Sequence, residues 1–255
     1  MKFIHLTDPH LVTPGDKLKG LDPAARLEPA FDDIARHHAD AECCVITGDL
    51  ADIGEASAYV WLSERLASFD IPCHLIIGNH DSREEFVAHF GDTPVDPDGY
   101  VQSVVDTSAG KFVLLDTVEA GTHGGEYCDA RQAWLRRTLD ELAGEPVYLF
   151  MHHPPFDIHM PCLDRIGLTQ QQAMVNIVTD HGNIRHLFFG HAHRPICGNW
   201  HGISFSTLRG TNHQVGLQFD RDVIDYVDEP PEYAVVFVDD DRIVIHSHSY
   251  PGVPG

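Results

Sequence analysis

The amino-acid sequence predicts one α/β domain built around two β-sheets. In its first third, short apolar strands alternate with amphipathic helices, the pattern of βαβ units and a largely parallel sheet. The middle and the end of the chain add further strands, some of them separated only by turns. The 255 residues contain no internal repeat, low-complexity linker or evident domain boundary, so we expect a single domain.

The first third is predicted to contain three strands and two helices, in the order 2–7, 23–38, 43–47, 55–68 and 73–77. The strands are short apolar runs that end in glycine or a polar residue. In the first helix, Leu27, Phe31 and Ile34 recur at helical spacing and would face the core.

The rest of the chain is predicted from the same patterns: a hairpin of strands 100–105 and 111–115, a helix at 129–142, a strand at 146–151, a helix at 169–181 and a strand at 186–189. Ser108-Ala109-Gly110 would form the hairpin turn and open an antiparallel region. The segment 203–248 reads as further strands joined by acidic loops.

Acidic residues outnumber basic ones by 39 to 17, which gives a formal net charge of −22. Such a charge disfavours a nucleic acid polymer as partner, because binding a polyanion needs a basic track. It does not disfavour a small phosphate ester, since bound divalent metals would reverse the local field. Most of the surplus acids lie in predicted loops such as 220–232, where solvated turns explain them.

Two further observations bear on location and redox state. No apolar run approaches the ~20 residues of a membrane span, and Asp8 interrupts the first apolar segment too early for a signal peptide. We therefore expect a cytoplasmic protein with no membrane partner. The six cysteines show no C-x-x-C spacing, so we expect reduced thiols rather than disulfides or a zinc–thiolate site.

Five of the predicted strands are followed directly by residues of metal-binding type. These are Asp8-Pro9-His10, Gly48-Asp49, Gly78-Asn79-His80-Asp81, His152-His153 and Gly190-His191-Ala192-His193. Because ligands usually bind at the carboxyl ends of strands in α/β sheets, we expect these groups to meet in space. Imidazole and carboxylate ligands suit Zn, Fe, Mn or Co.

The number of candidate ligands favours two ions over one. The seven candidates are Asp8, His10, Asp49, Asn79, His152, His191 and His193. They are too many for one tetrahedral ion, whereas two ions ~3.5–4 Å apart that share a carboxylate would use them all. Taken singly, Asp8 could cap a loop and Asn79 could fill a left-handed turn position. Five such coincidences, each at the end of a strand, favour a metal centre.

This set of motifs resembles the calcineurin-like metallophosphoesterases, in the family's order and over residues 1 to about 195. Two segments, 151–155 and 206–215, also resemble the bacterial class III cyclic nucleotide and glycerophosphodiester phosphodiesterases. The resemblance implies a four-layer α-β-β-α sandwich with two mixed sheets. It also implies a single domain over 1–255, in which 196–255 completes the second sheet and contributes to contacts between copies in a homo-oligomer.

The resemblance further implies a role for each matching residue. Asp8, His10 and His193 would hold one metal, Asn79, His152 and His191 the other, and Asp49 would bridge the two. His80 would contact the phosphate or the leaving-group oxygen, Asp81 would orient His80, and His213 would be a further phosphate contact. His153 would lie behind the ligands, although the sequence alone leaves open which of the two adjacent histidines binds metal. His123 and His159 are candidates for the lip of the substrate site.

The implied activity is hydrolysis of a small phosphodiester by a metal-bound hydroxide, with two divalent ions drawn from Mn, Fe, Zn and Co. Alternatives of the same chemistry are a phosphomonoesterase and a hydrolase of 2′,3′-cyclic phosphates or phosphonate esters. A remote alternative is a non-catalytic metal-binding scaffold. Purple acid phosphatases are disfavoured, because Asp52 occupies the position of their tyrosine ligand.

Overall fold

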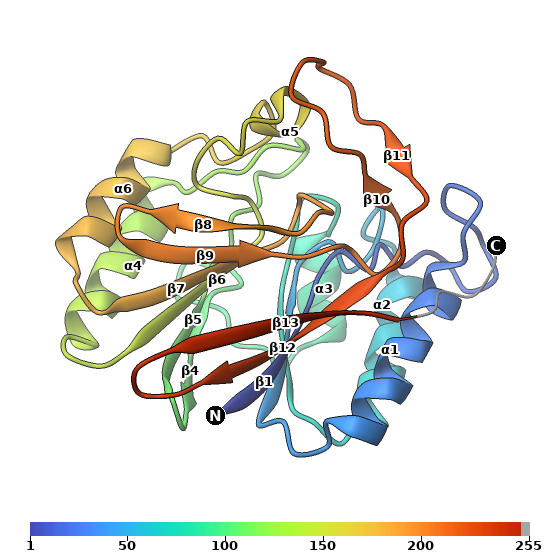
Figure 1. The fold of residues 1–255 in the computed structure, drawn as a ribbon, viewed down its shortest axis with the longest axis horizontal. Helices are drawn as coiled ribbons and strands as arrows, with labels where there is room; N and C mark the ends of the chain where they lie inside the picture. The colour runs from blue at the N-terminus through green and yellow to red at the C-terminus, as the bar shows by residue number, and fades with distance from the viewer. Residues whose placement is uncertain (251–255) are drawn as a thin grey trace.

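The computed structural model describes residues 1–250, which form two mixed β-sheets packed face to face with helices on both outer faces (Figure 1). The first sheet has the strand order β13-β12-β1-β2-β3, with β1 Lys2–Leu6, β2 Cys43–Thr47, β3 Cys73–Ile76, β12 Glu232–Val238 and β13 Ile243–Ser249. Strands β1, β2 and β3 run parallel, whereas β12 and β13 are antiparallel to their neighbours.

The second sheet has the order β4-β5-β6-β7-β9-β8, with β4 Ser103–Thr107, β5 Gly110–Leu114, β6 Val147–Met151, β7 Ile184–Phe189, β8 Ile196–Trp200 and β9 Ile203–Thr207. Its four inner strands are parallel, and only the edge pairs β4–β5 and β8–β9 are antiparallel. The expected antiparallel region after the hairpin is therefore wrong, because α4 carries the chain across the sheet between β5 and β6.

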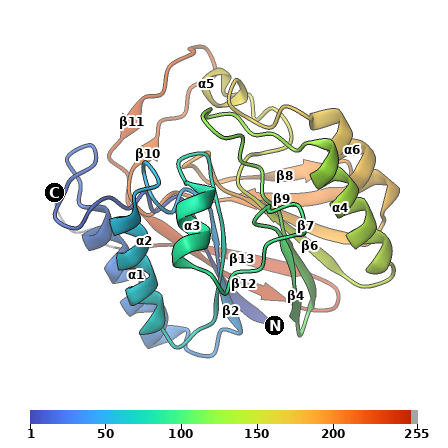
Figure 2. The same ribbon diagram turned by 180° about the vertical axis from the view of Figure 1, so that it is seen from behind.

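The helices are α1 Pro23–His37, α2 Ala56–Ala67, α3 Arg83–His89, α4 Asp129–Glu141, α5 Pro161–Asp164 and α6 Gln171–Asp180. Side chains of α1, α2 and α3 share a buried cluster with the first sheet, and those of α4 and α6 share one with the second (Figure 2). A third apolar cluster, which includes Phe3, Phe150 and Phe188, fills the space between the sheets. The four-layer sandwich is confirmed.

Local sequence explains where the helices begin. Helix α1 starts at Pro23 behind the cap Asp22, whose carboxylate accepts from the backbone N–H of Ala25 at 3.0 Å. Helix α3, which the periodicity did not predict, is capped by Ser82 and buries one apolar side chain, that of Phe86. A seven-residue helix with so little apolar repeat gives no 3.6-residue signal.

The predicted place of the last segment needs a correction. Strands β8 and β9 do complete the second sheet, but β12 and β13 extend the first one. Strand β12 lies between β1 and β13, so it is not an edge strand. Both of its faces are buried, because Tyr233 and Val235 join the cluster shared with α1 whereas Ala234 and Val236 join the cluster between the sheets. Strands β10 (Gln214–Val215) and β11 (Tyr226–Val227) belong to neither sheet and form a separate two-stranded arm that projects from the body (Figure 1).

Two sequence expectations about the whole chain can be compared with the structure. No helix in residues 1–250 is both long and apolar enough to span a bilayer. All six cysteines are free thiols, as expected.

Candidate metal centre

The seven candidate ligands converge where the carboxyl ends of the two sheets meet. Loops after β1, β2 and β3 carry the four from the first sheet, and loops after β6 and β7 carry the three from the second. All except Asn79 are almost completely buried. The two sheets are joined directly, since the backbone N–H of His191 donates to both carboxylate oxygens of Asp8 at 3.1 Å.

The backbone is strained at this junction. Five candidate ligands have left-handed backbone angles: Asp8 (φ 52°), His10 (45°), Asp49 (51°), His191 (67°) and His193 (48°). Non-glycine residues rarely adopt such angles, and those that do concentrate where function over-determines the conformation. In residues 1–250 only three other non-glycine residues do so, Lys19, His159 and His201. The strain is thus concentrated at the candidate centre.

The glycines in the motifs make room for the ligands. A Cβ on Gly78 would lie 2.2 Å from Oδ1 of Asp49, and one on Gly48 would lie 2.5 Å from Nδ1 of His152. A Cβ on Gly190 would lie 2.3 Å from Oγ1 of Thr7. No side chain fits at these distances, so each glycine allows one strand end to approach the other sheet.

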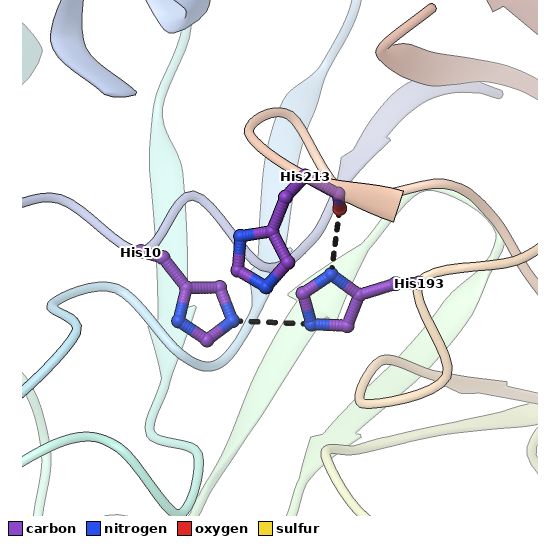
Figure 3. A group of neighbouring side chains, drawn as sticks. All are labelled: His10, His193 and His213. Atoms are coloured by element: carbon purple, nitrogen blue, oxygen red, sulfur yellow. Dashed lines mark hydrogen bonds between the residues drawn. The ribbon is translucent and has the colours of Figure 1, made fainter. Parts of the chain in front are cut away.

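In the first half of the centre, four hydrogen-bond acceptors face one another. His193 Nδ1 donates to the carbonyl oxygen of His213 at 2.8 Å (Figure 3), and His10 Nδ1 donates to Asp52 Oδ1 at 3.1 Å, which leaves both Nε2 atoms as lone-pair acceptors. These two Nε2 atoms are 3.1 Å apart. Asp49 Oδ2 lies 3.3 Å from His10 Nε2, and Asp8 Oδ1 lies 3.5 Å from His193 Nε2. None of these four atoms donates to another, and acceptors that face one another in this way fit a cation.

The second half has the same character. His152 Nδ1 donates to the carbonyl oxygen of Thr47 at 2.8 Å, so its Nε2 is again an acceptor. This Nε2 lies 3.3 Å from Asp49 Oδ2 and 3.2 Å from Asn79 Oδ1. The carboxylate oxygen Oδ2 of Asp49 therefore faces His10 on one side and His152 on the other, the position that a bridging ligand requires.

The two histidines of the Gly190–His193 loop lie in different halves of the centre. His193 clusters with Asp8, His10 and Asp49, whereas His191 clusters with His152 and His153, with ligand-type atoms within 4.8 Å of one another in each group. His153 lies behind the pair: its Nδ1 is 2.8 Å from Oγ1 of Thr117, and its Nε2 is buried. Nitrogen Nε2 of His152, by contrast, faces Asp49.

The predicted orientation of His80 is wrong in one respect, since Asp52 and not Asp81 holds this ring. His80 Nδ1 donates to the carbonyl oxygen of Asp52 at 2.6 Å and lies 3.6 Å from its Oδ1. Asp81 instead accepts from Tyr59 Oη and from the backbone N–H groups of Leu50, Ala51 and Gly78, at 2.8–3.0 Å. Asp81 thus fixes the loops that carry Asp49 and Asn79.

His80 and His213 both line a pocket of about 350 Å³, whose floor is formed by five of the seven candidate ligands, His10, Asp49, Asn79, His191 and His193. The ring of His213 stacks on that of His193, with centroids 4.6 Å apart. His123 also lines the pocket and is 3.1 Å from the side-chain nitrogen of Asn79, whereas His159 is exposed and is not among the lining residues.

The ionisable side chains of the centre shift one another's pKa values. Burial would raise the pKa of Asp49, but the imidazoles of His152 and His10 hold it well below its usual range. Burial lowers the pKa of His10 and His191, so both rings are neutral. Burial would also lower the pKa of His152, yet the Asp49 carboxylate raises it to about 9. Without a metal, a proton at His152 balances Asp49, and a divalent cation would replace that proton.

Asp52 is the functional residue that sequence patterns missed. Its carboxylate reaches both His10 and His80, which come from the loops after β1 and β3. The available signal was its position three residues after Asp49, on the same loop. Two other residues that line this pocket, Lys19 and Tyr226, could not be predicted from the sequence, because both lie outside every motif.

Comparison with known proteins identifies relatives over nearly the whole chain. The model of the calcineurin-like phosphoesterase family matches residues 1–195. A probable cyclic nucleotide phosphodiesterase from Rhodopseudomonas palustris is 44% identical over 254 residues, which are 98% of this chain and 93% of that protein. A probable glycerophosphodiester phosphodiesterase from Arcobacter nitrofigilis is 26% identical over 211 residues, 82% of this chain and 77% of that protein.

A solved structure has the same fold. The dimetal phosphatase from Danio rerio superposes with a TM-score of 0.70 at 18% identity and covers 97% of this chain and 96% of its own.

Proposed function

The chain belongs to the calcineurin-like phosphoesterase family, and from this premise we propose that it is a metal-dependent hydrolase of small phosphodiesters, of the cyclic nucleotide or glycerophosphodiester type. The observation that carries the proposal is the convergence of acceptor atoms around Asp49 Oδ2, which offers ligand atoms for a cation on each side of this oxygen. The relatives named above support the diester as the substrate class.

Two divalent ions would be held by the candidate ligands. Asp8, His10 and His193 would bind one ion, Asn79, His152 and His191 the other, with Asp49 shared. When bound, such ions acidify a coordinated water towards pKa ~7 and offset the charge of a phosphate. The ligand set is compatible with Mn, Fe, Zn and Co.

The side chains around the ions would position the substrate and move a proton. His80 lines the pocket and is 27% exposed, so it can reach the phosphate or donate a proton to the leaving oxygen. His213 lies beside His193 and would contact the phosphate from the other side. Asp81 would act through the loops that it holds, and Asp52 through His10 and His80.

A substrate panel tests this proposal. The Mn-loaded protein should hydrolyse 3′,5′-cyclic AMP or a glycerophosphodiester faster than phosphomonoesters, and Asp49→Ala should abolish turnover and the binding of at least one ion. Normal rates and two bound ions in Asp49→Ala would refute the site. Association of copies through residues 196–255, of which 251–255 lie outside the described residues, remains a prediction, which native mass spectrometry can test.

A further inference from the structure

The pocket has an outer half whose lining differs from its floor. Around the candidate ligands the lining is imidazole and carboxylate, whereas farther out it includes Leu163 and Ile166 near α5 and Ile224 and Tyr226 of the arm. Part of this wall belongs to a small apolar cluster that joins α5 to the arm through Leu163 and Val215. The outer half is therefore a built wall and not an open surface.

A lysine stands over the aromatic ring in this wall. The backbone groups of Leu18 and Leu21 bond each other at 2.8 and 2.9 Å across a tight turn in which Lys19 (φ 52°) and Gly20 (φ 80°) are both left-handed. This turn places Nζ of Lys19 3.7 Å from the centroid of the Tyr226 ring, a cation–π contact. Burial raises the pKa of Asp52 and lowers that of His213, and the nearby lysine charge acts on both groups to lower the pKa.

The ring of Tyr226 connects this wall to the centre. Its centroid lies 5.1 Å from that of His213, which itself stacks on His193. Tyr226 is nevertheless 49% exposed, so much of its apolar surface has no partner in the described chain. A ligand whose phosphate lies on the floor of the pocket would reach this ring with one of its esterified alcohol groups.

Resting on the proposed phosphodiesterase function, we propose that the outer half is a subsite for a planar aromatic group carried by the esterified alcohol, such as the nucleobase of a nucleotide, held against Tyr226. The about 350 Å³ of the pocket exceeds what a phosphate alone needs and suits a ligand of nucleotide size. The glycerol arm of a glycerophosphodiester would instead need hydrogen-bond partners for its hydroxyls. Two polar groups of the outer wall are already engaged, Arg165 with Asp222 and His123 with Asn79.

Lys19 contributes in a different way. Its ammonium group is held at the pocket mouth in a protein of net charge −22, so it is a local attraction for an anionic diester of either type. Its effect should not depend on the ester group, whereas the effect of Tyr226 should. Substitutions of the two residues should therefore change the KM values in different ways.

The test compares KM values for 3′,5′-cyclic AMP and glycerophosphoglycerol, both anionic diesters, in the Mn-loaded protein. Tyr226→Ala should raise KM for cyclic AMP at least about fivefold, the range of base–aromatic stacking, and change KM for glycerophosphoglycerol by less than about twofold. Lys19→Met should raise both KM values together and weaken their dependence on salt. The control is Phe219→Ala, an aromatic of the same arm that is 63% exposed and outside the pocket lining, which should change neither.

Equal KM changes for the two substrates in Tyr226→Ala, or none, would overturn the subsite. A loss of oligomeric mass in Tyr226→Ala but not in Phe219→Ala would also overturn it, because the ring would then serve an interface. If the wild-type protein hydrolyses neither diester, the proposed function itself fails. If both diesters are hydrolysed and the ratio of their two KM values is unchanged in Tyr226→Ala, the subsite is refuted and the proposed function is not.

Discussion

Asp52 offers the sharpest test of how the centre is held together. Its Oδ1 is 3.1 Å from His10 Nδ1, whereas His80 is held mainly by the Asp52 backbone oxygen at 2.6 Å. Changing the side chain therefore removes the partner of His10 and leaves the main contact of His80. Loss of an outer partner of a metal-bound histidine typically costs 10–100-fold in metal affinity, which is about 1.4–2.7 kcal/mol.

The two available substitutions should differ. The amide of Asp52→Asn can still accept from His10 and should lie near the tenfold end, whereas Asp52→Ala leaves Nδ1 of His10 unpaired and should lie near the hundredfold end. Calorimetric titration with Mn measures both, and Asp70→Asn, an exposed carboxylate before β3, controls for the change of net charge. Wild-type Mn affinity in both Asp52 variants would refute this role.

Three further predictions concern stability and the close approach of the loops. Burial lowers the pKa of His5 to about 3 and that of His186 to about 4, so the unfolded chain binds more protons below pH 6.5, and these two histidines together should lower the free energy of unfolding by about 4 kcal/mol between pH 7.5 and 5. Urea titrations in which His5→Gln loses as much stability as the wild type would contradict this. Gly78→Ala should displace Asp49 and abolish binding of at least one Mn ion. The control Gly182→Ala, whose added Cβ meets nothing within 4 Å, should bind as much Mn as the wild type. Equal Mn stoichiometry in the two variants would count against the steric explanation. Chelation should lower the melting temperature, since ligands that bind only the native state stabilise it, and an unchanged midpoint would argue against structural coupling of the metals.

The sequence predicted the fold and the ligands where the signal was local and regular. Each strand that ends in a metal-binding residue is a short apolar run, so its end was readable from hydrophobicity. Separate sheets still meet at one site, because they pack face to face with their carboxyl ends at the same edge. That packing brings Asp8 against His191, 183 residues apart.

The predictions that were wrong, and the residues that were missed, have a different physical cause. The pairing of β12 with β1 is a contact over more than 230 residues, and periodicity within a strand does not choose its neighbour. Asp52 has the role that was predicted for Asp81, because both residues lie close to the same loops and only the geometry decides which of them meets His80. Tyr226 is half-exposed, and no pattern marks such a residue as part of a pocket.

The central claim is that two metal ions share Asp49 and that His191 and His193 belong to different ions. Anomalous X-ray scattering from crystals of the Mn-loaded protein tests it most directly. The account predicts two Mn peaks ~3.5–4 Å apart on either side of the Asp49 carboxylate, one beside His193 and the other beside His191. A single peak bound by both histidines would contradict it.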